Sequence, residues 1–175
     1  MRRIDSRNCI ASICAIVAVV AIAYPGRSRA STEPLTDKMA AFNYLTGGSW
    51  KCSTKVPAVG ARPAHTEQVT VVFSLAPGNT IHSRVSGPGY SRDRYYGYKA
   101  KSRLYWAASV DNQGSYGFET SRDGATYDGS TWFGGMSLSL KLRNTLAKVN
   151  ANEFTTHEVL SGGRLQMAVD TVCAR

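Results

Sequence analysis

The feature that most constrains the fold is an alternation of apolar and polar residues with a period of two. The clearest run is MSLSLKLR, residues 136–143, where Met136, Leu138, Leu140 and Leu142 alternate with serine or basic residues. Successive side chains of a β-strand point to opposite faces, so this pattern predicts strands with one buried face. Such runs recur from residue 49 onward, whereas residues 33–48 have apolar residues at helical spacing.

Short segments rich in Gly, Pro, Asn and Asp separate the runs, for example APGN at 76–79 and SRDG at 121–124. Turns this short join antiparallel hairpin partners. A long meander exposes two unpaired edges unless its first and last strands pair. We therefore predict an all-β fold: a single closed antiparallel up-and-down barrel with a short N-terminal helix. The predicted strands, about ten in number, lie near residues 49–56, 66–75, 79–86, 91–99, 103–110, 114–121, 125–133, 135–143, 147–160 and 163–173.

The N-terminus has the pattern of a secretory signal peptide over residues 1–30. A basic segment, MRRIDSRN, precedes an apolar run that extends to Tyr24, and SRA at 28–30 supplies small residues for cleavage. The alternative is an uncleaved anchor, but the run from Cys9 to Tyr24 is shorter than the roughly 20 residues of a spanning helix. We expect a periplasmic or secreted protein without a stable membrane span, with residues 31–48 leading into a barrel over 49–175.

Removal of this segment changes the charge of the protein. Residues 1–30 hold five of the 21 Lys and Arg and one of the 12 Asp and Glu, which leaves 16 against 11, a net of +5. A charge of this size favours solubility and only mild attraction to anionic surfaces. Together with export, it argues against nucleic acid as a partner.

Two cysteines remain in the predicted mature chain, Cys52 in the first strand and Cys173 in the last. An oxidising compartment favours a disulfide between them. The alternative, a reactive thiol pair, would be expected to show C-x-x-C spacing. Both cysteines fall on the apolar faces of strands that are neighbours in a closed barrel, so the bond would join the seam from inside.

Gly48-Ser49-Trp50, after a short helix, resembles the Gly-x-Trp signature of the calycin superfamily, which includes lipocalins, fatty-acid-binding proteins and nitrobindin-like barrels. In lipocalins a basic residue near the last strand packs on this Trp, and Arg164 and Arg175 are the candidates here.

Later segments resemble a group of secreted bacterial barrels of unknown function. These segments are YYGYKAKSRLYWAASVDNQGSYGFETSRDG (95–124), NEFTTHEV (152–159) and DTVCAR (170–175). The resemblance covers roughly residues 42–175 and implies a ten-stranded lipocalin-like barrel without an established activity. The chain departs from fatty-acid-binding proteins in lacking their helix pair, and from lipocalins in lacking a clear C-terminal helix.

The sequence offers few residues for metal or catalytic chemistry. His65, His82 and His157 have no metal-ligand spacing, so we predict no metal site. Nitrobindin-like barrels hold haem through a histidine near the last strand, and His157, one strand earlier, leaves haem binding as an alternative. No nucleophile elbow is present, and we predict no catalytic residue. Glu119 and Glu158 could point into a barrel, but we expect both to be exposed strand carboxylates.

Aromatic and basic residues are interleaved in YSRDRYYGY, residues 90–98, a mixture that suits single-stranded nucleic acid. Tyrosine is also a good strand former, and we read Arg92, Arg94 and the tyrosines around them as strand residues.

A barrel of this size is either filled by side chains or holds one small ligand. We predict non-covalent binding of a small hydrophobic ligand in the interior. The alternative is a filled aromatic core in an envelope or interaction protein that acts through its surface. The predicted interior lining is Trp50, Phe73, Trp106, Tyr116, Phe118, Tyr127, Phe133, Met136, Leu138 and Met167.

Overall fold

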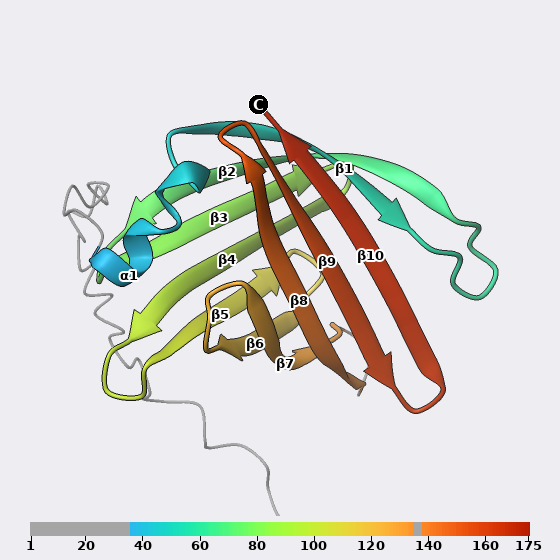
Figure 1. Ribbon diagram of the computed structural model, residues 1–175. Coiled ribbons are helices and arrows are strands. Elements are labelled where there is room, and N and C mark those ends of the chain that lie inside the picture. The colour runs from blue at the N-terminus through green and yellow to red at the C-terminus, as the bar shows by residue number, and fades with distance from the viewer. Residues whose placement is uncertain (1–35, 135–137) are drawn as a thin grey trace, which may run out of the picture.

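A computed structural model describes residues 36–134 and 138–175 of the chain as a closed barrel of ten antiparallel strands (Figure 1). Each strand pairs with its neighbours in sequence, and the first also pairs with the last. The predicted fold class and strand number are therefore confirmed. The proposed signal peptide, residues 1–30, lies outside the described residues. The strands are β1 (Gly48–Val56), β2 (His65–Ala76), β3 (Thr80–Gly87), β4 (Tyr90–Lys99), β5 (Leu104–Asp111), β6 (Tyr116–Ser121), β7 (Thr126–Trp132), β8 (Ser139–Asn150), β9 (Glu153–Gly162) and β10 (Leu165–Ala174).

The turn between β8 and β9 differs from the prediction. The predicted strands 135–143 and 147–160 leave residues 144–146 as the connection, but β8 continues to Asn150 and the turn lies at 151–152. There the Asn150 side-chain oxygen accepts a hydrogen bond from the Asn152 backbone N–H at 2.8 Å. The extension places Asn144 in mid-strand, where its side chain is buried inside the barrel.

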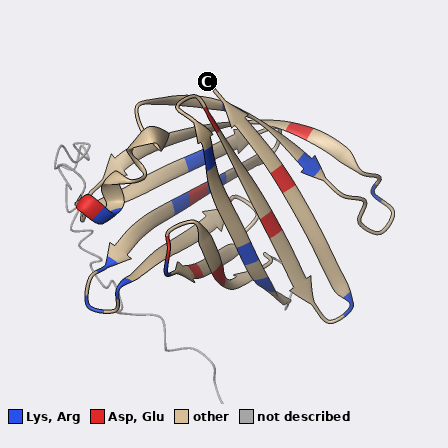
Figure 2. Ribbon diagram, viewed as in Figure 1, with Lys and Arg blue, Asp and Glu red and all other residues tan. Residues whose placement is uncertain are grey.

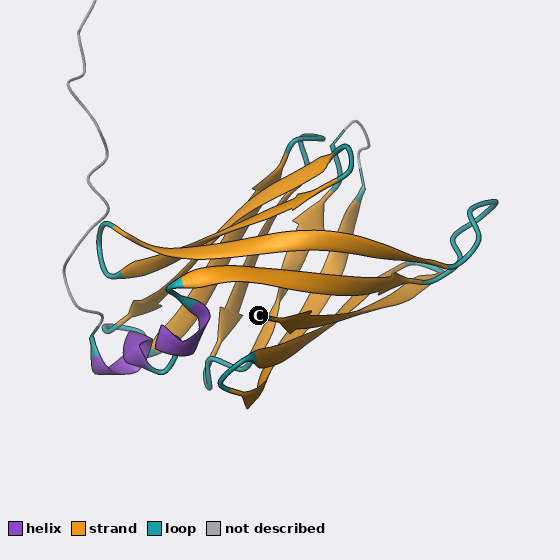
Figure 3. Cartoon of the chain, turned by 90° about the horizontal axis from the view of Figure 1, so that it is seen from above, coloured by secondary structure: helices purple, strands orange, loops and turns teal. Residues whose placement is uncertain are grey.

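Two short helical segments close one end of the barrel, α1 (Asp37–Ala40) and the 3-10 turn η1 (Asn43–Leu45). They are shorter than the helix predicted from residues 33–48. Their apolar side chains nonetheless join the main core, in which Met39, Phe42 and Leu45 are buried. Seen from above, the helical segments lie at one end and the tip of the β1–β2 hairpin extends at the other (Figure 3).

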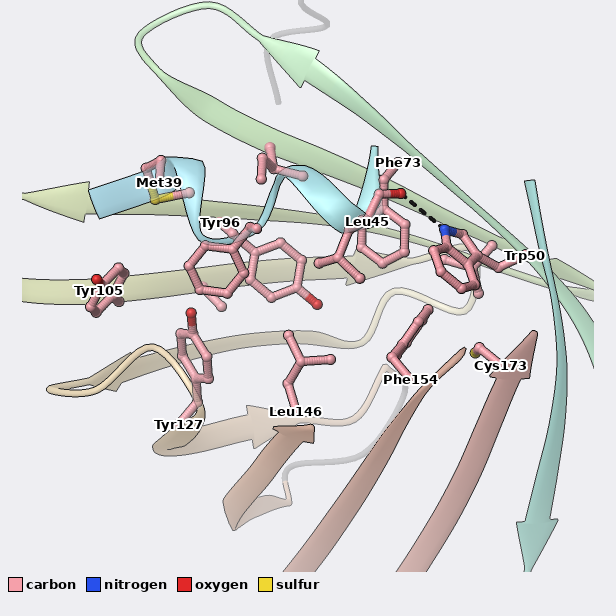
Figure 4. Close-up of a cluster of buried hydrophobic side chains, with 14 of the residues drawn as sticks. Met39, Leu45, Trp50, Phe73, Tyr96, Tyr105, Tyr127, Leu146, Phe154 and Cys173 are labelled. Carbon is pink, nitrogen blue, oxygen red and sulfur yellow. Dashed lines mark hydrogen bonds between the residues drawn. The ribbon is translucent and has the colours of Figure 1, made fainter. Parts of the chain in front are cut away.

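Trp50 lies beneath the helical segments and anchors them to the sheet (Figure 4). Its Nε1–H donates a hydrogen bond to the Leu45 carbonyl at 2.9 Å, and its ring meets the edge of Phe154 at a centroid distance of 4.8 Å. The Arg175 guanidinium carbon lies 4.5 Å from the centre of the Trp50 ring. Of the two basic candidates, Arg175 therefore makes the predicted contact.

Cys52 and Cys173 form the predicted disulfide, with their Cα atoms directly opposite in the β1–β10 register. Both are buried, so the bond joins the seam from the inside. Structural disulfides persist in oxidising compartments, which is consistent with a location outside the cytoplasm. Within residues 36–134 and 138–175, no helix has the length and apolar character needed to cross a membrane.

We predict that the disulfide contributes a large share of the free energy of unfolding. It links residues 121 positions apart, and the chain-entropy model gives a loop of this length roughly 4–5 kcal/mol. Replacing Cys52 and Cys173 together by Ala should lower the guanidinium midpoint, measured by tryptophan fluorescence. The reduced wild-type protein is the control and should unfold at about the same midpoint as the double variant. An unchanged midpoint in the double variant would show that the seam does not need the bond.

Candidate ligand-binding site

The interior of the barrel is filled at the helical end. Aromatic rings pack edge to face there, with centroid distances of 5.8 Å for Phe42 and Tyr105 and 6.1 Å for Tyr96 and Tyr127. A second, smaller apolar cluster consists of Leu140, Leu142 and Leu160, with Phe133 and Met167 packed against it. Buried side chains thus occupy much of the interior at the helical end.

A partly open cavity of about 200 Å³ lies beside the smaller cluster. It is bordered by the β3–β4 and β5–β6 connections and by Phe133 after β7, at the end of the barrel away from α1. Its lining combines apolar side chains, among them Leu142 and Leu160, with charged and hydroxyl side chains. The lining residues are Tyr90, Arg92, Ser109, Asp111, Gln113, Ser115, Tyr116, Thr131, Phe133, Leu142, Glu158 and Leu160.

Behind the cavity, the barrel contains a buried ion pair between β4 and β6. The Arg94 Nη2 atom donates to Glu119 Oε2 at 2.8 Å, and the two residues are only 2% and 1% exposed. Burial raises the pKa of Glu119, and the Arg94 guanidinium opposes that shift. Arg94 also lies 5.1 Å from the centre of the Tyr96 ring. A buried charge of either sign needs its partner, because removal of one leaves the other desolvated.

Arg92 and Glu158 face the cavity as a looser pair. The distance from Arg92 Nη1 to Glu158 Oε2 is 3.7 Å, too long for a hydrogen bond. Within the described part of the chain, the buried Nε of Arg92 has no acceptor. Asp111, also in the lining, is already engaged: its Oδ1 accepts the backbone N–H groups of Gln113 and Ser115 at 2.9 and 2.8 Å. Arg92 and Glu158 therefore bring opposite charges to the cavity, with side chains that are 29% and 19% exposed.

Further polar atoms inside the barrel also lack partners among the described residues. A smaller space of about 80 Å³ adjoins Arg92 and Arg94 on the side of Phe73 and Phe154. Buried polar groups in proteins are nearly always satisfied by protein, water or a bound molecule. The unpartnered atoms are Arg92 Nε, Arg94 Nε, Glu119 Oε1, Tyr127 Oη and Asn144 Oδ1.

The structure assigns the predicted lining residues to three places. Trp50, Phe73 and Tyr127 are buried at the filled end, and Phe133 and Met167 pack beside the smaller cluster. Met136 lies outside the described residues. Trp106 and Phe118 point outward from β5 and β6, so the prediction is wrong for these two residues. Tyr116 is 54% exposed and borders the cavity only at its rim, and Leu138 precedes β8 and is 40% exposed.

The outward position of Trp106 follows from the strand beside it. Tyr105 and Ala107 point inward from β5, and Trp106 covers Gly97 of β4 on the outside. A Cβ atom at Gly97 would lie 2.5 Å from the Trp106 ring, so only glycine leaves room for this contact. The tryptophan is thus partly shielded without entering the interior.

Tyr116 and Phe118 lie outside because β6 turns its polar face inward. Glu119 takes the inner position opposite Arg94, which leaves Tyr116 54% and Phe118 52% exposed. Tyr116 stacks on Trp132 with a centroid distance of 5.1 Å and an interplanar angle of 10°. The expectation that Glu119 and Glu158 are exposed is also wrong, since both lie inside.

Sequence reasoning missed Arg92 and Arg94 as interior residues. A signal was present: in YSRDRYYGY both arginines share the face of Tyr90, Tyr96 and Tyr98. That face is the inner one. A carboxylate at the matching position of a nearby strand would have supported the assignment, and Glu119 provides it.

The histidines do not point into the cavity. His157 Nδ1 contacts Asp170 Oδ1 at 2.6 Å on the outer face, so His157 is not placed to bind haem inside the barrel. His82 contacts Asp93 at 2.7 Å, and His65 contacts Glu67 at 3.0 Å. In the described ranges, no three His, Cys, Asp or Glu side chains gather as a metal site would require.

Both signs of charge are interspersed over the strands (Figure 2).

Comparison with known proteins adds little to this picture. No family model matches the chain, and no curated protein matches it. Among solved structures, the chain is similar to the ywiB protein from Bacillus subtilis, with a TM-score of 0.24 and 10% identity over 71% of this chain and 87% of that one. A likeness this slight carries no argument about function, and the calycin resemblance stays a prediction.

We predict that Arg94→Met destabilises the barrel by about 3–5 kcal/mol, because it leaves Glu119 buried without its partner. Protonation of Glu119 removes that charge. The loss of unfolding free energy in Arg94→Met should therefore be smallest below the pKa of an unfolded Glu, about 4.3. It should grow as the pH rises through the raised pKa of Glu119 in the folded protein. Urea titrations at several pH values measure this.

The double variant Arg94→Met/Glu119→Gln is the control for this prediction, because it removes both charges and should recover much of the loss at neutral pH. Equal midpoints for the wild type and Arg94→Met would contradict the role of the buried pair.

Proposed function

We propose that the barrel binds a small organic ligand non-covalently in the cavity at its open end. The observation that carries this proposal is the pair Arg92 and Glu158, which line the cavity with opposite charges 3.7 Å apart, too far for a hydrogen bond to each other. A cavity with an apolar wall and a few converging polar groups is the usual form of a small-molecule site. The apolar body of the ligand would lie against Leu142, Leu160 and Phe133.

The size of the cavity limits the ligand. About 200 Å³ is below the 300–1,000 Å³ typical of pockets for drug-sized molecules. Beyond the cavity, buried aromatic side chains such as Tyr96 and Tyr127 leave a space of only about 80 Å³, which would not hold a long chain. The ligand we propose is therefore compact. Its hydrophobic part is shorter than a ligand that touched every residue of the predicted lining would need.

We also propose that the protein works in the periplasm or outside the cell. The signal-peptide pattern of residues 1–30 supports this location, and so does the buried disulfide.

A second candidate function is supported by the outer surface. Tyr116, Phe118 and Trp132 are exposed together on β6 and β7, and exposed apolar groups of this kind often mark interaction sites. In this alternative the protein acts through its outer face.

Filling the cavity tests the first proposal. Ser109 lies on the inner face of β5 and lines the cavity, so Ser109→Phe should abolish ligand binding. Native mass spectrometry of the protein purified from its own compartment, before and after organic extraction, should show an extra mass on the wild type that Ser109→Phe lacks.

Ser74→Phe is the matched control, because Ser74 is exposed on the outer face of β2. It should retain the extra mass, and thermal unfolding should show that both variants fold. A bare mass in every wild-type preparation would refute interior binding and favour the outer surface.

A further inference from the structure

The charges on the cavity wall restrict the ligand further, and this inference rests on the proposed interior binding. The lining contains one cation, Arg92, and two carboxylates, Asp111 and Glu158. A ligand with only an acidic group would pair with Arg92 but would be repelled by both carboxylates. A ligand with only an amine would pair with Glu158 but would be repelled by Arg92. In a ligand with both groups, each of these repulsions is offset by an attraction between opposite charges.

The spacing of the two wall charges indicates how far apart the ligand charges should be. Arg92 Nη1 and Glu158 Oε2 are 3.7 Å apart. When an amine and a carboxylate are attached to one carbon, bond lengths of about 1.5 Å place the nitrogen and the nearer oxygen about 3 Å apart. In such a ligand the carboxylate can lie next to Arg92 while the ammonium lies next to Glu158. If the two ligand charges were farther apart, only one of them could lie next to its partner.

The hydrogen-bonding groups agree with this arrangement. The Arg92 side chain lines the cavity and is 29% exposed, so its guanidinium can donate to a ligand carboxylate. The Glu158 side chain lines the cavity too and is 19% exposed, so its carboxylate can accept from an ammonium. Asp111 is less available, because one of its oxygens already accepts two backbone N–H groups.

We propose that the ligand is a zwitterion of the α-amino-acid type. Its carboxylate binds Arg92, its ammonium binds Glu158, and its apolar side chain packs against Leu142 and Leu160. A volume of about 200 Å³ suits an amino acid with a branched aliphatic side chain. The charged lining residues select the two charges, and the apolar lining residues select the side chain.

Four matched probes test this inference by calorimetry at neutral pH: L-leucine, 4-methylpentanoate without the amine, 3-methylbutylamine without the carboxylate, and neutral 3-methylbutan-1-ol. Charge-assisted hydrogen bonds support an advantage of about tenfold or more for L-leucine over either singly charged probe. If 4-methylpentanoate or 3-methylbutylamine binds as tightly as L-leucine, the zwitterion inference is wrong while interior binding stands.

Two variants separate recognition from a general effect on the fold. Arg92→Met should remove the advantage of L-leucine over 3-methylbutylamine, and Glu158→Gln should remove its advantage over 4-methylpentanoate. Arg143→Met is the matched control: Arg143 is exposed and pairs with Asp128 on the outer face, so affinity should not change. A structural defect would weaken all four probes together, and that result would overturn the assigned roles.

The remaining outcomes distinguish the inference from the function beneath it. If none of the four probes binds but native mass spectrometry shows an extractable ligand that Ser109→Phe loses, the inference fails and interior binding stands. If no probe binds and no extractable mass is present, both proposals fail.

Discussion

The pairing of β1 with β10 is the constraint on which the rest of the structure depends. It runs over five residue pairs, from Lys51 opposite Ala174 to Lys55 opposite Asp170, and the disulfide lies within it. Without this pairing the meander would be an open sheet with two exposed edges. Closure also creates an inside and an outside, and every further property of the interior follows from which face of each strand it encloses.

Closure encloses polar residues as well as apolar ones. Arg92, Arg94, Glu119 and Glu158 come from three strands and lie between the aromatic core and the open end. Two cations and two anions balance one another, which lowers the cost of burying them. The inner pair is tightly hydrogen-bonded and structural, whereas the outer pair is loose and faces the cavity. The barrel thus changes from a packed core to a polar cavity along its axis.

The alternation of apolar and polar residues predicted about ten strands and closure of the barrel, and the two remaining cysteines predicted the disulfide. The resemblance to calycins predicted the contact of Trp50 with a basic residue. Prediction from the sequence failed where apolar residues were assumed to point inward. On β5 and β6 the face predicted to be inner is the outer one. Glu119 takes an inner position on β6 because its carboxylate pairs with Arg94, and Trp106 takes an outer position on β5, where Gly97 leaves room for its ring. Which side of a strand faces inward is decided by partners on other strands, and a single strand does not reveal them. The charged residues in the lining of the cavity were missed for the same reason.

The order of the strands has a consequence for how the barrel folds. All pairings but one join strands that are consecutive in the chain, so hairpins can add one after another with little loop-closure entropy. The seam is the exception, since it brings together residues 121 positions apart. Contacts between distant residues slow folding. The geometry therefore favours a zipper of hairpins that closes into a ring last, with oxidation of the cysteines locking that final step.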